Sequence, residues 1–163
     1  MCGLRAAAYN RRMDDAPLPN AVESGAPTTR WSVGGLLLEA IAARDLRGLA
    51  DCFAPDATMR ALLPSGPASF TGHDEITAAF RKWFGGAQGF EVLDGTVGEV
   101  GGRLHVSWRL RVHPTPKGDD RWHVIEQQSF AHAADRITSM DLLCSGFLPE
   151  DQVADAPTVG ARS

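Results

Sequence analysis

The stretch Arg103–His113, RLHVSWRLRVH, decides the fold class because its polarity changes at every residue. Alternation with a period of two places the two sets of side chains on opposite faces of a β-strand. We therefore predict a strand here, with the arginines and histidines on its outer face. Its inner face would carry the apolar set, which consists of Leu104, Val106, Trp108, Leu110 and Val112.

Similar patterns continue on both sides of this strand. Further strands are predicted at 57–63, 90–100, 121–131 and 136–148, separated by turns rich in Gly, Pro, Ala and Asp. Helical spacing of apolar residues predicts three earlier helices, at 32–44, 46–53 and 72–84. Three N-terminal helices and a mostly antiparallel sheet indicate an α+β fold, with the helices packed on one sheet face.

Composition narrows the possible functions. The 163 residues carry a net charge of −4 with no Lys/Arg cluster, which argues against nucleic-acid binding, and no apolar run is long enough to span a membrane. The cysteines Cys2, Cys52 and Cys144 have neither metal-site nor disulfide spacing, so we predict a reducing, cytoplasmic location. Patternless ends predict flexible tails at 1–30 and 151–163 around one domain at 31–150.

Three sequence segments then indicate a family. They are AARDLRGLADCFAPDATM (42–59), FTGHDEITAAF (70–80) and VIEQQSFAHAADRITSMDLL (124–143). Their order resembles the nuclear transport factor 2-like superfamily, and its SnoaL-like and ketosteroid-isomerase-like branches in particular, over residues 32–148. The resemblance implies a strongly curved sheet that forms a cone-shaped α+β barrel around an apolar pocket. It also implies a homodimer that pairs through the outer sheet face, where we expect Arg109, Arg111, His123 and Gln127 to be partly buried.

The same resemblance assigns roles to individual positions. Glu126 corresponds to the carboxylic acid that donates to the oxyanion in ketosteroid isomerases, whereas Ala61 and Leu37 stand where those enzymes have a general-base aspartate and a tyrosine. In relatives similar to limonene-epoxide hydrolase, Val124 and Leu142 stand at the positions of an arginine and a second aspartate. Neither mechanism is therefore intact in this chain.

Glu126 is also a candidate acid from the residues alone. Alternation places Trp122, Val124 and Glu126 on one face of their strand. If that face is the one with Trp108, the carboxyl lies in an apolar pocket, loses hydration and can be protonated near neutrality, ready to donate a hydrogen bond. Alternatively, Glu126 pairs with a hydroxyl, an arginine or Gln128 and only stabilises the fold.

These arguments predict a small cofactor-independent SnoaL-like enzyme, a cyclase, isomerase, dehydratase or epoxide-opening enzyme, that acts on a hydrophobic polycyclic or polyketide-like molecule. The alternative is a non-catalytic ligand-binding or dimeric assembly module with the same fold. Glu126 and Gln128 are the predicted catalytic residues, and no metal site is expected. His105, His113, His123 and His132 are predicted on the surface or the dimer face. The predicted substrate-binding residues are Trp108, Trp122, Val124, Met140, Leu142, Cys144, Ala61, Leu37, Met59 and Phe80.

Overall fold

The computed structural model describes residues 29–115 and 120–154. Its elements, in chain order, are α1 (Thr29–Ala43), α2 (Leu46–Asp51), β1 (Phe53–Leu63), β2 (Gly66–Thr71), α3 (His73–Phe84), β3 (Gly89–Val100), β4 (Arg103–His113), β5 (His123–Ala133), β6 (Ile137–Cys144), β7 (Leu148–Pro149) and α4 (Glu150–Ala154). The secondary structure thus extends beyond residues 31 and 150 at both ends. Tails were predicted at 1–30 and 151–163, and of these the segments 1–28 and 155–163 lie outside the described residues.

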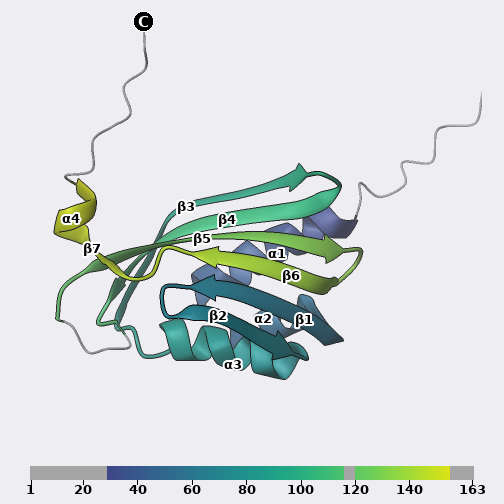
Figure 1. The fold of residues 1–163 in the computed structure, drawn as a ribbon, viewed down its shortest axis with the longest axis horizontal. Coiled ribbons are helices and arrows are strands. Elements are labelled where there is room, and N and C mark those ends of the chain that lie inside the picture. Colours follow the sequence, from purple (N-terminus) through teal and green to yellow (C-terminus); the bar gives the residue numbers. More distant parts are fainter. Residues whose placement is uncertain (1–28, 116–119, 155–163) are drawn as a thin grey trace, which may run out of the picture.

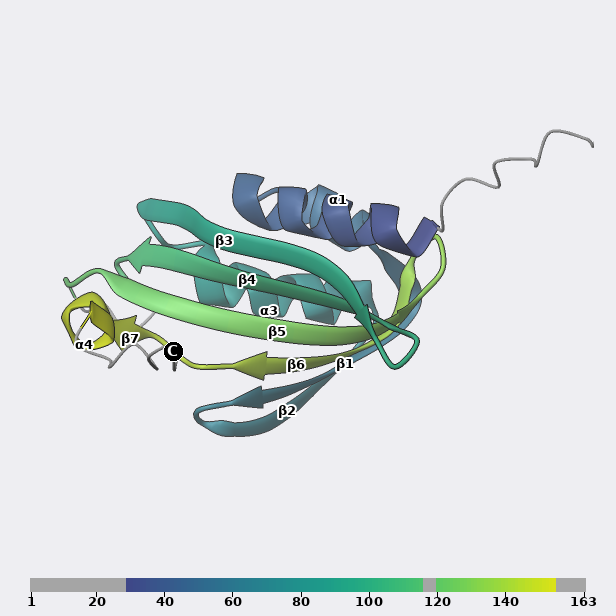
Figure 2. The ribbon, with the colours of Figure 1, turned by 90° about the horizontal axis from the view of Figure 1, so that it is seen from above.

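The strands form one seven-stranded sheet in the order β2-β1-β6-β5-β4-β3, with β7 paired to the start of β5. The pairing of β1 with β6 is parallel and all the others are antiparallel. Helices α1, α2 and α3 lie against one face of this curved sheet (Figures 1 and 2). The predicted α+β class and the mostly antiparallel sheet are confirmed.

Three short elements were not predicted from the sequence. Strand β2 begins in a segment rich in Gly, Pro and Ser, which resembles a loop; it tolerates Pro67 because it is the edge strand of the sheet. Strand β7 has two residues and α4 has five, which is too short for a periodic signal. As a result, α3 follows a β1–β2 hairpin instead of a single strand.

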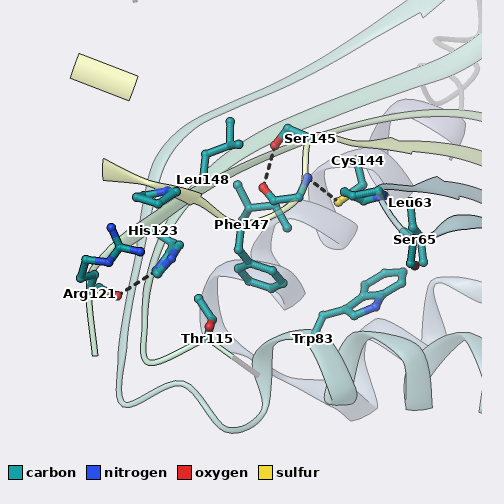
Figure 3. A pocket seen from close by; sticks show the side chains of 14 residues that line it. Leu63, Ser65, Trp83, Thr115, Arg121, His123, Cys144, Ser145, Phe147 and Leu148 are labelled. Carbon is teal, nitrogen blue, oxygen red and sulfur yellow. Dashed lines mark hydrogen bonds between the residues drawn. The ribbon is translucent and has the colours of Figure 1, made fainter. Parts of the chain in front are cut away.

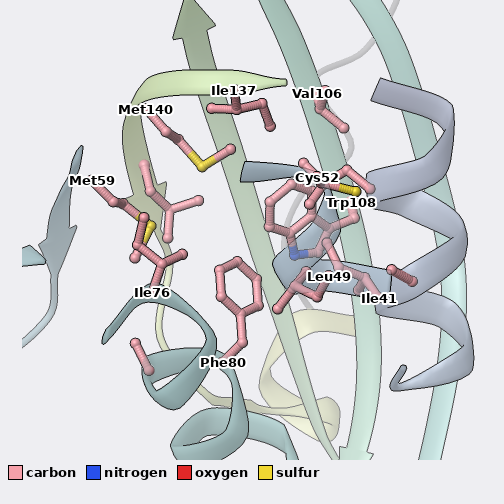
Figure 4. Packing of buried hydrophobic residues seen from close by; sticks show 14 of the residues in the cluster. Ile41, Leu49, Cys52, Met59, Ile76, Phe80, Val106, Trp108, Ile137 and Met140 are labelled. Carbon is pink, nitrogen blue, oxygen red and sulfur yellow. The ribbon is translucent and has the colours of Figure 1, made fainter. Parts of the chain in front are cut away.

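The hydrophobic core lies between the helices and the inner face of the sheet (Figure 4). Helix α1 supplies Val33, Leu37 and Ile41, whose spacing places them on one helical face. Trp108 is the largest fully buried side chain, and the ring of Phe80 from α3 lies 6.3 Å from its ring, centre to centre. The middle of the sheet is therefore covered by a filled core.

No helix in the described part of the chain is long and apolar enough to cross a membrane.

Two neighbouring glycines in α1 differ in their surroundings. A Cβ atom at Gly34 would lie 2.7 Å from Val97 Cγ1 and 3.1 Å from Leu104 Cδ1, whereas a Cβ at Gly35 would meet nothing within 4 Å. Alanine favours a helix over glycine by about 1 kcal/mol, and overpacking a core costs about 1–3 kcal/mol.

We therefore expect Gly35→Ala to raise the free energy of unfolding by about 0.5–1 kcal/mol. Gly34→Ala should instead lower it by up to about 2 kcal/mol, because the overpacking cost exceeds the gain in helix propensity. Urea denaturation of the two variants beside wild type measures both. Equal effects of the two substitutions would contradict the close packing of α1 on β3 and β4.

Candidate functional site

The pairing of β4 with β5 determines which side chains face the interior. Trp108 lies opposite Gln127, and the indole Nε1 donates a hydrogen bond of 2.7 Å to Gln127 Oε1. Gln127 is fully buried, and its Nε2 has no hydrogen-bond partner among the described residues. The inward set on β5 thus has odd numbers and comprises His123, Ile125, Gln127, Ser129 and Ala131.

Glu126 points away from the core, so the prediction that it shares a face with Trp108 is wrong. Its side chain is 48% exposed, and its Oε2 lies 3.8 Å from Nε of Arg109, the residue opposite it on β4. Gln128 lies on the same outer face, where its Oε1 is 3.3 Å from Nε2 of His105. An exposed, ion-paired carboxylate is not desolvated, so the argument for a neutral acid does not apply to Glu126.

Trp122 and Val124 were also predicted to face the core beside Trp108, and both placements are wrong. The guanidinium of Arg111 lies 3.9 Å above the Trp122 ring, which places this ring among the side chains that surround Arg111. Val124 pairs with Leu148 of β7 and is buried there, outside the main core cluster. The face of β5 that was predicted to line a pocket therefore lies on the other side of the sheet.

Most of the other predicted ligand contacts are core residues. Each is at most 3% exposed, and none lines the cavity described below; they are Leu37, Met59, Ala61, Phe80, Trp108, Met140 and Leu142. Cys144 is the predicted contact that does line this cavity. The side chains of α1, α3 and the sheet fill the space around Trp108 where the pocket was expected (Figure 4).

A cavity of about 530 Å³ lies instead at the end of the sheet where β1, β6 and α3 end and β5 begins. We call it the end cavity. Figure 3 shows Phe147 in its middle, Trp83 and Leu63 on one side, and His123 with Arg121 on the other. Its wall consists of Leu63, Pro64, Ser65, Trp83, Thr115, Arg121, His123, Ile125, Cys144, Ser145, Gly146, Phe147, Leu148 and Pro149.

His123 is the residue of this wall that is best suited to proton transfer. It is 4% exposed, and its Nδ1 lies 2.8 Å from the carbonyl oxygen of Arg121. A carbonyl only accepts hydrogen bonds, so Nδ1 carries the proton and the basic lone pair of the neutral ring lies on Nε2. The prediction that His123 lies on the outer face is wrong, and so is that for Gln127.

The segment after β6 closes one side of the end cavity. Strand β7 pairs with His123 and Val124, and Glu150 at the start of α4 binds Arg111 through two hydrogen bonds of 2.8 and 3.0 Å. The hydrogen bonds that Arg111 donates to Glu150 raise the pKa of Arg111 further, so its guanidinium stays charged. Residues 145–149, including Phe147, are thereby held against the cavity.

The two cysteines of the described chain have different environments. Burial, with added repulsion from Asp51 and Asp45, raises the pKa of Cys52 to about 11, so its thiol stays protonated. Cys144 is half-buried on the cavity wall, where its sulfur accepts a hydrogen bond of 3.4 Å from the Gly146 amide. Cys144 is therefore the thiol placed to report on a ligand in the cavity.

A second cavity of about 520 Å³ lies between α1, α2 and the end of α3 and includes Phe80 in its wall. Its charged groups already form hydrogen bonds that stabilise the fold. Asp45 caps α2 by accepting from two backbone amides, and Arg44 donates to the carbonyl of Ala87. Among the described residues, no three His, Cys, Asp or Glu side chains converge as a metal site would require.

Comparison with known proteins identifies the family. Residues 36–140 match the model of the SnoaL-like domain, and the chain therefore belongs to the SnoaL-like family within the nuclear transport factor 2-like superfamily. A search among curated proteins finds no match.

Solved structures share the fold at low sequence identity. Bal32a from a soil-derived mobile gene cassette is 14% identical, with a TM-score of 0.58 over 72% of this chain and 90% of its own. A steroid delta-isomerase from Pseudomonas aeruginosa is 17% identical, with a TM-score of 0.55 over 77% and 84%. A proposed polyketide cyclase from Xanthomonas campestris is 15% identical, with a TM-score of 0.56 over 71% and 89%.

Gln127 and Gln128 offer a direct test of which face of β5 is buried. A glutamate at position 127 would occupy a fully buried site, where its charged form loses hydration and its pKa rises above the unfolded value of about 4.3. The carboxyl then keeps its proton to a higher pH in the folded protein than in the unfolded chain. The variant is therefore stable below about pH 4.3 and loses stability as the pH rises above that value.

We expect Gln127→Glu to approach wild-type stability near pH 4 and to lose about 1.4 kcal/mol per pH unit above it until the carboxyl ionises in the folded state. Gln128→Glu, on the half-exposed outer face, is the matched control and should follow wild type at every pH. Thermal unfolding from pH 4 to pH 8 measures both. Superimposable pH profiles of the two variants would contradict the observed register.

Proposed function

We propose that the chain binds a hydrophobic, polycyclic or polyketide-like small molecule in the end cavity, and that His123 transfers a proton to or from it. The observation that carries this proposal is a cavity of about 530 Å³ whose wall holds one buried imidazole in a single tautomer. Cavities of about 300–1,000 Å³, mainly apolar with a few placed polar groups, are typical of small-molecule sites.

The apolar part of the wall suits a flat ligand. Trp83 from α3 and Phe147 from the segment after β6 both reach the cavity (Figure 3), and Ile125 and Leu63 extend the apolar surface along the strands. Aromatic rings gain most from ligands that offer a ring face or edge. Trp83 itself is held by Phe80, at a ring separation of 5.2 Å.

His123 supplies the chemistry in this proposal. Neutral Nε2 accepts a proton from an acidic C–H of the ligand, and the resulting imidazolium returns it to another atom, so that no proton is gained or lost overall. Isomerisation, dehydration and aldol-type cyclisation all need such a step. The Arg121 carbonyl stabilises the imidazolium through the Nδ1–H bond, much as an acceptor does in other His-dependent sites. The reaction requires no cofactor.

Ligand binding is measured first, through Cys144. In a Cys2→Ser background, alkylation by iodoacetamide should modify Cys144 and leave Cys52 intact, since the pKa of Cys52 is raised to about 11. Saturating naphthol should slow Cys144 alkylation by about tenfold if it fills the cavity. Alkylation at an unchanged rate with naphthol and other flat phenols would overturn the binding proposal.

Proton transfer is measured by hydrogen–deuterium exchange at the acidic C–H of tetralone in D₂O, followed by NMR. Wild type should accelerate exchange over buffer, and His123→Gln should lose most of that acceleration, on the order of 100-fold, while still protecting Cys144 in the presence of the ketone. Gln128→Ala, on the opposite sheet face, should exchange at the wild-type rate. Bound tetralone without faster exchange would overturn the catalytic role of His123.

That last outcome would favour the second candidate function, a non-catalytic binding module. A specific observation supports it. Leu37 and Ala61 stand where the resemblance places the tyrosine and the general-base aspartate of related isomerases, and both are buried residues without an ionisable group. A protein with this arrangement would bind the same flat ligands and leave them unchanged.

A homodimer through the outer sheet face is also proposed. Two leucines that pair across β1 and β6, Leu62 and Leu143, are 56% and 46% exposed there. Arg109 and Glu126 lie on the same face and offer both charge signs to a second copy.

Sedimentation at micromolar concentration should therefore give a dimer for wild type, and Leu143→Glu should shift it to a monomer because it places a charge within the apolar contact. Leu36→Glu, at a leucine exposed on α1, is the matched control and should remain dimeric. A monomeric wild type would remove this proposal.

A further inference from the structure

The segment that follows β6 is held at its two ends by different contacts. At its start, the Ser145 amide donates to the carbonyl oxygen of Glu126 over 2.9 Å, and the Ser145 hydroxyl accepts from the Glu126 amide over 2.9 Å. At its end, the Glu150 amide donates to the carbonyl oxygen of Trp122 over 3.0 Å. We call residues 145–150 the strap. The residues between its two anchors all line the end cavity.

The contacts along the middle of the strap are short. Strand β7 pairs with the start of β5 over two residues, Leu148 and Pro149, and a proline has no amide hydrogen to donate. Phe147 packs against the ring of Phe84 at a separation of 6.5 Å, centre to centre. A pairing of two residues is weak by itself, so the position of the strap depends on what holds its far end.

The backbone turns sharply directly after the first anchor. Gly146 has a φ of +82°, and a Cβ atom there would lie 2.5 Å from Cγ of Pro64. Glycine is the residue that adopts such a conformation without strain. Hinges are positions at the ends of elements that absorb changes in φ and ψ. Rotation at Gly146 would carry Phe147 out of the cavity while Ser145 stays bonded to β5.

The ion pair between Arg111 and Glu150 holds the far end of the strap. Arg111 Nε donates to Glu150 Oε1 over 2.8 Å and Nη2 donates to Oε2 over 3.0 Å, so the contact is bidentate. The same guanidinium lies 3.9 Å from the centre of the Trp122 ring, and its Nη1 lies 3.3 Å from an oxygen of Glu91. Partly exposed ion pairs contribute to stability when they have this geometry and belong to a network.

We propose that the strap is a movable cover of the end cavity, which opens about Gly146 and is latched shut by the Arg111–Glu150 ion pair. Neither charged residue lines the cavity, so the latch opens and closes without a change in the strand residues of the wall. In the open form Phe147 leaves the cavity, and a ring system has room to enter or leave. The inference goes beyond the proposed function, because it concerns access to the cavity and holds for any occupant.

Alkylation of Cys144 by the bulky reagent N-phenylmaleimide tests the latch in the full chain, in a Cys2→Ser background and without ligand. The raised pKa of Cys52, about 11, keeps that thiol unreactive. Glu150→Ala should alkylate about fivefold faster than wild type, because the strap opens more often. Glu91→Ala is the matched control: it removes the other carboxylate at Arg111, one that lies on β3 and not on the strap, and should react at the wild-type rate.

Amide hydrogen exchange followed by NMR tests the hinge in the Arg111→Gln variant. The Glu150 amide, beyond the hinge, should exchange about fivefold faster than in wild type, whereas the Ser145 amide, before the hinge, should exchange at the wild-type rate. Added salt should speed exchange of the Glu150 amide in wild type, because it screens a partly exposed ion pair, and should have little effect in the variant.

These measurements separate the inference from the proposed function, because neither uses a ligand. Unchanged alkylation of Glu150→Ala, or equal acceleration in Glu91→Ala, would overturn the latch. Equally faster exchange at Ser145 and Glu150 would overturn the hinge, since the whole segment would then detach from β5. Failure of naphthol to protect Cys144 would leave the latch and hinge results unaffected.

Discussion

The hydrogen bond from Trp108 to Gln127 joins β4 and β5 at the centre of the inner sheet face, and the orientation of the strands around it depends on this pairing. An antiparallel pair places directly opposite residues on the same face. With Trp108 buried, Gln127 must be buried, and every second residue of β5 follows it. A shift by one residue would place Glu126 in the core and His123 in solvent. The identity of the candidate base is thus a consequence of strand register.

Side chains fill the centre of the core, and the end cavity lies at one end of the sheet. The rings of Phe80 and Trp108, with Met59 and Met140, occupy the space beneath the middle of the strands. The end cavity lies beyond Ile125, where the sheet ends and the chain returns through residues 145–149. The Arg111–Glu150 ion pair holds this returning segment, so an outer-face interaction determines the shape of an inner-face cavity.

The outer face has a different physical character from the core. Its cross-strand neighbours form ion pairs, such as Arg109 with Glu126, and a three-membered group in which Arg60 and Arg103 both bind Asp141. Burial alone would raise the pKa of Asp141, but the two guanidinium groups outweigh it and lower the pKa, so the carboxylate stays charged. These contacts orient the outer face without contributing to the cavity, and they leave Leu62 and Leu143 exposed between them.

Sequence alone determined the fold class, because the alternation in Arg103–His113 and the helical spacing of Leu37 and Ile41 are local properties of the chain. It did not determine the site. Alternation predicts that Glu126 and Gln127 face opposite ways. Which of the two is buried depends on whether Gln127 or Glu126 lies opposite Trp108, and only the register of β4 with β5 in the folded sheet shows this. One local signal pointed the right way, since the inward set on β5 contains no Asp, Glu, Lys or Arg whereas the outward set contains Glu126. The end cavity brings together β1, α3, β5 and residues 145–149, which are distant in sequence, and their meeting is a property of tertiary packing alone.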